Sequence, residues 1–238
     1  DNADAIFTWD YEKGARPALN KLYEKAKNSQ WNGETDLDWS INVDQEAVVV
    51  AILPGSRRSE IDYLAPLFFA AAARMLAARP SLQFVVPAAP GLRARIEAAA
   101  RNSGLHGHLH IVDGQSHAVL AACDTVLLAS GTATLEAALF KRPMVIAYNM
   151  HALSWQIMRR KKLQPWVGLP NILLQDFAVP ELLQDAATPE AMADETLQWL
   201  AHPEAVRTLQ ARFEALHNSL KMDTTQLATD AIEKIIAH

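Results

Sequence analysis

The chain has 238 residues, a length that suits one large domain or two small ones. Half of its residues are apolar and 21% are charged, which is a globular composition and excludes wholesale disorder. A net charge of −5 gives no support for a nucleic acid polymer as partner, and the single cysteine, Cys123, excludes an internal disulfide framework and a multi-cysteine zinc site.

Neither a membrane-spanning segment nor an export signal is expected. No apolar run reaches the roughly 18–20 residues that cross a bilayer. The sequence opens at Asp1 without a basic and then apolar leader. The lone cysteine also fits a reducing compartment, so we predict a cytoplasmic location.

The first 46 residues differ in composition from the rest. They carry 5 basic against 10 acidic residues, and they hold Trp9, Trp31 and Trp39, half of all the tryptophans. The remainder carries equal numbers of acidic and basic side chains. This break predicts an N-terminal segment of different origin, 1–46, made mostly of helix and loop, and a domain that covers 47–238.

From residue 47 the sequence alternates between strand-like and helix-like segments. Residues 47–53 form a continuous apolar run rich in β-branched residues, which is typical of a strand buried on both faces of a parallel sheet. A Pro-Gly turn ends the run. Ser59 with Asp62 resembles a capping box, and it predicts a long helix that reaches about Ala78.

The same alternation continues along the chain. Strands are predicted at 82–86, 108–112, 124–129 and 143–147, with helices between them at 91–102, 116–122 and 132–140. Helices predominate after Pro180, and one is capped by Thr188 with Pro189 at its first position. Such alternation implies right-handed crossovers, so the predicted fold class is α/β, with a doubly wound parallel sheet.

Ligands of such sheets bind at the carboxyl ends of the strands, in the loops that lead into helices. One loop is built from small and hydroxyl-bearing residues: Ser130, Gly131, Thr132, Ala133 and Thr134. Small residues let the backbone approach a phosphate, and the N–H groups that begin a helix attract an anion. Glu136, about one turn later, is placed to accept hydrogen bonds from ribose hydroxyls. An ordinary helix cap and turn is the alternative interpretation of this loop.

A second loop follows the first predicted strand. Ser56 and Arg57 come after a strand and a Pro-Gly turn, where a guanidinium could clamp a diphosphate and offset charge that develops on a leaving nucleotide. The alternative is a surface arginine paired with Glu60. Neither loop is a Walker A sequence and no G-x-G-x-x-G occurs, so kinase and standard dinucleotide interpretations lose their main support.

Several segments together resemble one bacterial family, lipid-A-disaccharide synthase, in its C-terminal half. They are L-P-G-S-R-R-S-E-I (53–61), V-V-P-A-A-P (85–90), D-G-Q-S (113–116), L-L-A-S-G-T-A-T-L-E-A-A-L (127–139), R-P-M-V-I-A-Y (142–148), G-L-P-N-I-L (168–173) and V-P-E-L-L-Q (179–184). The order and spacing also match. The resemblance covers about residues 47–238.

The resemblance implies a Rossmann-like C-terminal half of a GT-B glycosyltransferase. Such an enzyme transfers 2,3-diacylglucosamine from its UDP carrier to 2,3-diacylglucosamine 1-phosphate and releases UDP, with no metal and no cofactor. Ser56 and Arg57 would then face the diphosphate, the loop 130–134 would cradle it, and Glu136 would contact the uridine portion. Gln115 and Asn171 match polar positions near the donor cleft, and Arg57 and Asn171 are the candidate catalytic residues.

Two departures from the family bear on activity. The N-terminal half, which supplies the acceptor cleft and an acidic general base, is not in this sequence, so the residues present are expected to bind nucleotide with little or no turnover. Many relatives also have Arg after the Tyr of the A-Y segment, where this sequence has Asn149. One cationic contact is therefore expected to be lost.

The N-terminal segment itself is similar to the opening of ferritin-like di-iron oxygenases. Iron sites of that class need Glu ligands from several helices and two Glu-x-x-His pairs. The chain offers one helical pair, Glu214 with His217, which we interpret as part of a plain surface helix. No iron site is predicted, and the alternating His106, His108 and His110 lack a carboxylate or cysteine that would complete a metal site.

The segment from Leu153 to Trp166 mixes bulky apolar residues with four consecutive cations, Arg159 to Lys162. Such a segment suits an anionic membrane surface, at about 1 kcal/mol per cation, and equally suits an ordinary helix with a basic end. With the family resemblance, it predicts a protein peripheral to the inner membrane, and a homodimer is a further expectation. Cys123, beside an apolar strand, is predicted to be a buried small hydrophobe.

Other functions remain open at this level. One alternative is a non-catalytic nucleotide-sugar-binding or interaction module. Another is a different UDP-sugar enzyme, such as a UDP-N-acetylglucosamine epimerase, whose ligand cleft is built in the same way. A di-iron oxygenase would depend on the N-terminal segment alone. The absence of a G-x-S-x-G elbow or a Ser-His-Asp order removes support for a hydrolase.

Overall fold

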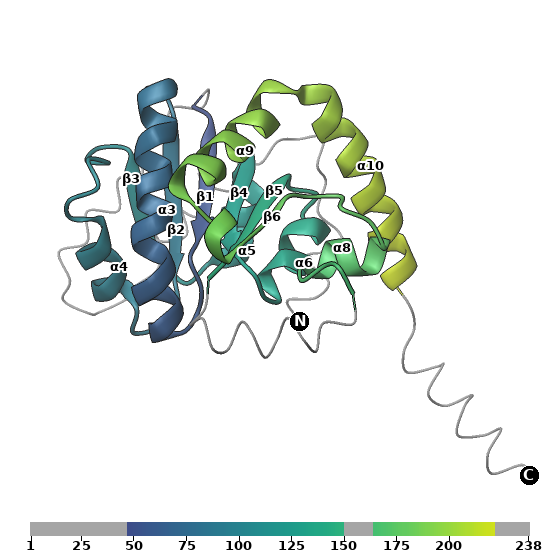
Figure 1. The fold of residues 1–238 in the computed structure, drawn as a ribbon, viewed down its shortest axis with the longest axis horizontal. Helices are drawn as coiled ribbons and strands as arrows, with labels where there is room; N and C mark the ends of the chain where they lie inside the picture. The colour runs from purple at the N-terminus through teal and green to yellow at the C-terminus, as the bar shows by residue number, and fades with distance from the viewer. Residues whose placement is uncertain (1–46, 150–163, 222–238) are drawn as a thin grey trace, which may run out of the picture.

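A six-stranded parallel sheet forms the centre of the protein. The structure, a computed structural model, describes residues 47–149 and 164–221 (Figure 1). The strands are β1 (Val49–Leu53), β2 (Gln83–Ala88), β3 (Leu109–Asp113), β4 (Thr125–Ala129), β5 (Met144–Tyr148) and β6 (Glu181–Leu183). They lie in the order β3-β2-β1-β4-β5-β6, and every neighbouring pair is parallel.

The order of the strands reverses between β1 and β4. The chain builds outward from β1 through β2 to β3, then crosses back to lay β4 against the other side of β1, with Leu53 opposite Leu128. The predicted α/β class and doubly wound parallel sheet are thereby confirmed. The reversal leaves the loops after β1 and β4 on neighbouring strand ends, with their helices leaving on opposite faces.

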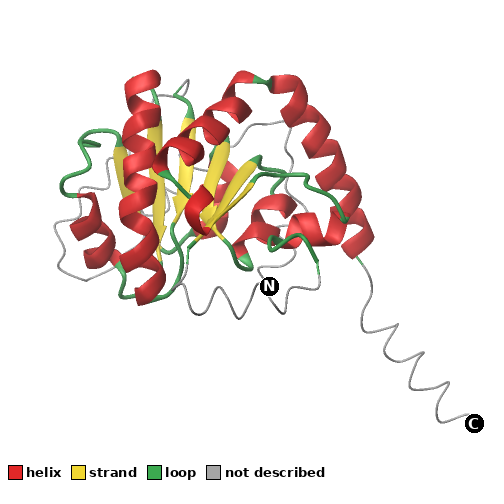
Figure 2. Cartoon of the chain, viewed as in Figure 1, coloured by secondary structure: helices red, strands yellow, loops and turns green. Residues whose placement is uncertain are grey.

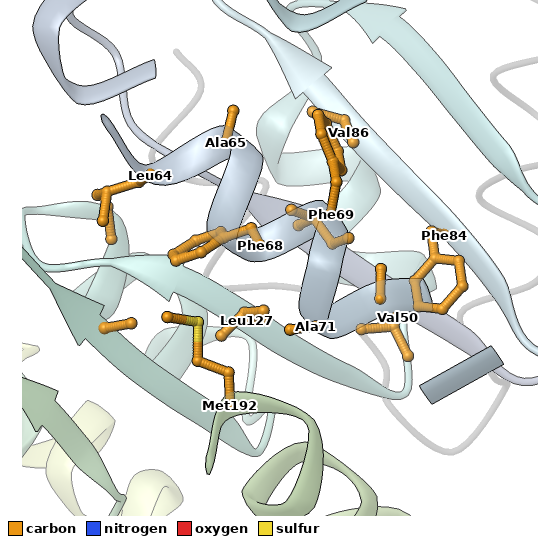
Figure 3. Packing of buried hydrophobic residues seen from close by; sticks show 14 of the residues in the cluster. Val50, Leu64, Ala65, Phe68, Phe69, Ala71, Phe84, Val86, Leu127 and Met192 are labelled. Atoms are coloured by element: carbon orange, nitrogen blue, oxygen red, sulfur yellow. The ribbon is translucent and has the colours of Figure 1, made fainter. Parts of the chain in front are cut away.

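One face of the sheet is covered by α3 (Arg58–Ala78), α4 (Arg93–Ala100) and α9 (Pro189–Ala201). Alternate strand residues such as Val50, Phe84 and Leu127 point to this face, where Phe68 and Phe69 of α3 pack on them (Figure 3). The helices flank the strands on both sides (Figure 2). Burial of these aromatic and branched side chains is the main stabilising contribution on this face.

The opposite face is covered by α5 (Ser116–Ala122), α6 (Ala133–Leu139) and α10 (Pro203–Leu220). Val49 and Ala51 of β1, with Val126 and Leu128 of β4, point to this side. Because successive side chains of a strand alternate between faces, a strand covered on both faces must be apolar throughout. This explains the unbroken apolar run that predicts β1.

The long helix α3 begins differently from its prediction. The capping box expected from Ser59 and Asp62 is wrong: Arg57 is the residue before the helix, and the Glu60 carboxylate accepts its backbone N–H at 3.2 Å. Ser59 therefore lies within the first turn. Asp62 instead pairs with Arg95 of α4, at 2.8 Å.

Most other predicted elements are present, with shifted ends. Helix α4 begins at Arg93, since Gly91 has φ +75° and belongs to the preceding turn, and β2 continues to Ala88. Helix α5 has its predicted bounds, and the Thr188 hydroxyl caps α9 by accepting the Ala191 N–H at 3.2 Å. The short edge strand β6 and helix α8 (Leu169–Leu174) were not predicted.

One helix is an exception to the expectation about membrane-spanning segments. By length and composition alone, α3 is apolar enough to cross a bilayer. Eight of its residues are buried, and they pack against the sheet and against α4 and α9. Its apolar character is explained by this central position in the core.

Candidate functional site

A cavity of about 500 Å³ opens at the carboxyl ends of the strands, where the strand order reverses. Four successive strand ends contribute to it. Its lining consists of Leu53, Gly55, Ser56, Arg57, Glu60, Pro87, Ala88, Ala89, Pro90, Gly114, Ser116, Ala129, Ser130, Gly131, Thr132, Ala133 and Glu136. The structure thus brings the two loops that the sequence singles out into one hollow, the position at which open α/β sheets bind ligands.

The loop after β1 is held by Glu60. Its carboxylate accepts the backbone N–H of Ser56 at 2.9 Å and that of Arg57 at 3.2 Å, and it pairs with the Arg57 guanidinium at 3.2 Å. Gly55 has φ +127°, and a Cβ there would lie 2.5 Å from the carboxylate. Glycine is therefore required for the loop to close on Glu60.

Arg57 has the Glu60 partner of one interpretation and the position in the cavity that the other interpretation requires. It pairs with Glu60, yet it also lines the cavity, and its side chain is 79% exposed. An exposed ion pair contributes little to stability, about 0–1 kcal/mol. The guanidinium can therefore exchange Glu60 for a ligand anion at small cost.

The loop after β4 presents Ser130, Gly131, Thr132 and Ala133 to the cavity. Thr134, predicted to join them, is buried and is absent from the lining. Its hydroxyl donates to the Gly131 carbonyl at 2.7 Å and accepts the Leu169 N–H at 3.3 Å. Thr134 therefore fixes the shape of the loop from beneath.

Glu136 lines the cavity as predicted, and it has a partner that sequence reasoning missed. The Nε2 atom of His117, on α5, lies 3.2 Å from the Glu136 carboxylate. Local sequence carries no signal for this pair, since the two residues meet only because α5 packs against α6.

Gln115 and Asn171 are placed elsewhere. Gln115 is exposed and outside the lining, although its neighbours Gly114 and Ser116 contribute to it. Asn171 is fully buried outside the cavity: its amide donates to the Val179 carbonyl and to Glu181, both at 2.9 Å, and its oxygen accepts the Val179 N–H at 3.0 Å. The Asn171 amide therefore joins two parts of the fold, and it does not face the cavity.

The side chains of His108 and His110 contact residues at the start of the neighbouring strand β2. Nδ1 of His108 lies 3.0 Å from the Leu82 carbonyl, and Nε2 of His110 lies 2.9 Å from the Gln83 amide oxygen. Within residues 47–149 and 164–221, no group of three His, Cys, Asp or Glu side chains is arranged to hold a metal. The predicted oxygenase-like segment, 1–46, and the basic cluster lie outside the described residues.

Cys123 is fully buried, as predicted. Burial raises the pKa of its thiol to about 12, despite the opposing influence of Arg142. A thiol that stays protonated at neutral pH is a poor nucleophile, so Cys123 acts as a small apolar residue of the core.

Comparison with known proteins identifies the family. A sequence model described as lipid-A-disaccharide synthetase matches residues 21–235. The chain belongs to this family. The match includes residues 21–46, so it begins inside the segment that composition sets apart, and the boundary at residue 46 stays a prediction.

Relatives in the family are close in sequence over part of their length. A lipid-A-disaccharide synthase of Albidiferax ferrireducens is 65% identical over 192 residues, which are 79% of this chain and 49% of that protein. One of Neisseria meningitidis is 47% identical over 195 residues, covering 81% of this chain and 51% of that protein. The chain spans about half the length of the curated relatives it matches.

Solved structures of lower identity share the fold. A glycosyltransferase from Rickettsia africae superposes with a TM-score of 0.61 at 12% identity, over 98% of this chain and 54% of that chain. A UDP-GlcNAc 2-epimerase from Neisseria meningitidis, bound to UDP-GlcNAc, gives 0.58 at 14% identity, over 91% and 49%. These likenesses support the Rossmann-like, GT-B-type assignment of the fold.

Proposed function

We propose that this chain is the donor-binding half of a lipid-A-disaccharide synthase. It binds UDP-2,3-diacylglucosamine, from which the sugar passes to 2,3-diacylglucosamine 1-phosphate with release of UDP. The observation that carries the proposal is the cavity at the point where the strand order reverses, because Arg57 and the loop 130–133 both line it. Membership of the lipid-A-disaccharide synthase family supports this nucleotide sugar as the ligand of the cavity.

Different residues of the cavity contact different parts of the ligand. The diphosphate lies against the backbone and hydroxyls of Ser130 and Thr132, with Arg57 opposite, where charge-assisted hydrogen bonds are strongest. Glu136 accepts hydrogen bonds from the ribose hydroxyls. Glu60 holds the loop that carries Arg57 and releases the guanidinium to the diphosphate.

The transfer is a direct displacement with inversion. The acceptor's 6-hydroxyl attacks the anomeric carbon, the bond from that carbon to the phosphate oxygen breaks, and the acceptor proton passes to a base outside the described residues. The electron pair of the broken bond stays on UDP as negative charge. Arg57 stabilises that charge and so lowers the barrier to transfer.

Calorimetric titration with UDP tests the proposal. The chain is expected to bind UDP below millimolar concentration, and Arg57→Ala is expected to weaken binding by about 10- to 100-fold, since a hydrogen-bonded charge contributes about 1.5–3 kcal/mol. Arg101→Ala is the matched control, because Arg101 is exposed and outside the cavity lining. Lack of UDP binding at millimolar concentration would refute the site.

We also propose contact with the inner-membrane surface through the basic segment 153–166. Acyl-chain substrates leave a bilayer with difficulty, and four adjacent cations favour an anionic surface. Cosedimentation with vesicles rich in anionic lipid is expected, and it should fall when Arg159, Arg160, Lys161 and Lys162 are changed to Gln. Equal sedimentation of the two proteins would remove this part of the proposal.

A further inference from the structure

His117 lies where it can control the Glu136 carboxylate. Helix α5 starts at the rim of the cavity, with Ser116 in the lining, and His117 is the next residue. Its Nε2 atom is 3.2 Å from Glu136. Both side chains are partly exposed, at 40% for His117 and 33% for Glu136, and Glu136 lines the cavity.

The imidazole ring is fixed at a second point. Its centroid lies 5.7 Å from that of Phe140, which is buried with 3% exposure. Phe140 is the residue that directly follows α6, and its backbone N–H donates to the Glu136 carbonyl four residues earlier, so the two side chains lie on the same side of the helix end. The ring of His117 therefore spans one turn of α6, with its edge at the carboxylate and its face tilted against the aromatic ring.

The chemistry of the pair sets which of the two facing atoms carries the hydrogen. An ionised carboxylate only accepts, so Nε2 carries the hydrogen, whether the ring is the neutral tautomer or the imidazolium. The described residues provide Glu136 with no other side-chain partner than His117. Without His117, the carboxylate would turn freely among its rotamers at the edge of the cavity.

We propose that His117 is a positioning residue for ribose recognition: it holds the Glu136 carboxylate toward the ribose hydroxyls of a bound uridine nucleotide. The inference rests on the proposed function and deepens it, because it assigns the discrimination of ribose to a pair of side chains on α5 and α6. One carboxylate oxygen is tied to His117 and the other is left to accept from the ligand. The entropic cost of ordering the Glu136 side chain on ligand binding is then smaller, because His117 already restrains it.

The test compares two probes on the 238-residue chain, UDP and 2′,3′-dideoxyuridine diphosphate, by calorimetric titration. The unaltered chain is expected to prefer UDP. His117→Phe, which keeps a ring on Phe140 and loses the donor, is expected to reduce the affinity for UDP by about two- to tenfold and to leave the affinity for the dideoxy probe unchanged. His117→Gln, which returns an N–H donor near the Nε2 position, is expected to restore the preference.

The controls separate this role from a structural one. His106→Ala removes an exposed histidine outside the cavity lining and should change neither affinity, and thermal melting of each variant reports on folding. Equal preference for UDP in the unaltered chain and in His117→Phe would overturn the assignment of His117 while leaving the proposed function intact. Failure of the unaltered chain to bind UDP would overturn both.

Discussion

Single residues decide the shape of the loop after β1. Gly55 adopts φ +127° against the Glu60 side chain, and Glu60 in turn binds two backbone N–H groups and the Arg57 guanidinium. The sequence predicts that Ser56 and Arg57 sit at a ligand loop. It does not choose between Glu60 and a diphosphate as the partner of Arg57, because a spacing of three residues permits either contact.

Gly55→Ala is expected to destabilise the protein by about 2–4 kcal/mol, since it adds backbone strain of about 1–3 kcal/mol and displaces Glu60 from its contacts. Urea unfolding followed by circular dichroism measures this loss. Gly107→Ala is the matched control: Gly107 has φ +79° but open space around it, so only strain of about 1 kcal/mol is expected. Equal losses in the two variants would show that contact with Glu60 is unimportant.

At the scale of elements, a partly buried polar cluster joins α8 to β6. The Glu181 carboxylate accepts the backbone N–H groups of Val167 and Gly168, both at 2.9 Å, and the Asn171 amide. Leu169 then reaches Thr134 beneath the loop after β4. The cluster therefore links the edge of the sheet to the floor of the candidate site.

Sequence reasoning could not find this cluster. β6 has three residues, too few to show a period of two, and its neighbour α8 is a six-residue helix that contains Pro170. The resemblance singles out Asn171 as a polar residue of the family, and from that alone a catalytic role is the natural prediction. Its burial and its bonds to Val179 point instead to a structural role.

Asn171→Ala is expected to cost about 3 kcal/mol of unfolding free energy, because it leaves buried groups of Val179 without their partner. Urea unfolding measures it. Asn218→Ala on the exposed face of α10 should change stability by less than about 0.5 kcal/mol. A variant at Asn171 that keeps full stability and loses UDP binding would support the catalytic prediction instead.

At the scale of the whole molecule, the sequence predicts the layers better than their order. Runs such as 47–53 reveal strands buried on both faces, because each must be apolar throughout. The reversal between β1 and β4 depends on pairing across more than 70 residues, which local patterns do not encode. The candidate site could nevertheless be predicted from the sequence, since the loops that follow parallel strands all lie at the same edge of the sheet.

Helix α10, which ends the part of the chain that the structure describes, shows the same limit. The sequence predicts Glu214 and His217 on a plain surface helix. This prediction is wrong for His217, which is 4% exposed and makes a short contact with the buried Lys141 that follows α6. Glu214, by contrast, is largely exposed and pairs with Lys141 at 3.1 Å. These contacts, with Phe213 in the core, dock α10 on the sheet.

The docking of α10 makes stability depend on pH. Burial, and then the positive charge of Lys141, lower the pKa of His217 below its ordinary value of 6.5, while Glu214 opposes this. A lowered pKa means that the unfolded chain binds the proton more readily, so this contribution to stability is present above about pH 6.5 and is lost as the pH falls below it.

Urea unfolding at pH 7.5 and 5.5 should therefore show a smaller pH dependence for His217→Gln than for the unaltered chain. His106→Gln, at an exposed position, should match the unaltered chain. If His217→Gln lost as much stability on acidification as the unaltered chain, His217 would not be the group that titrates.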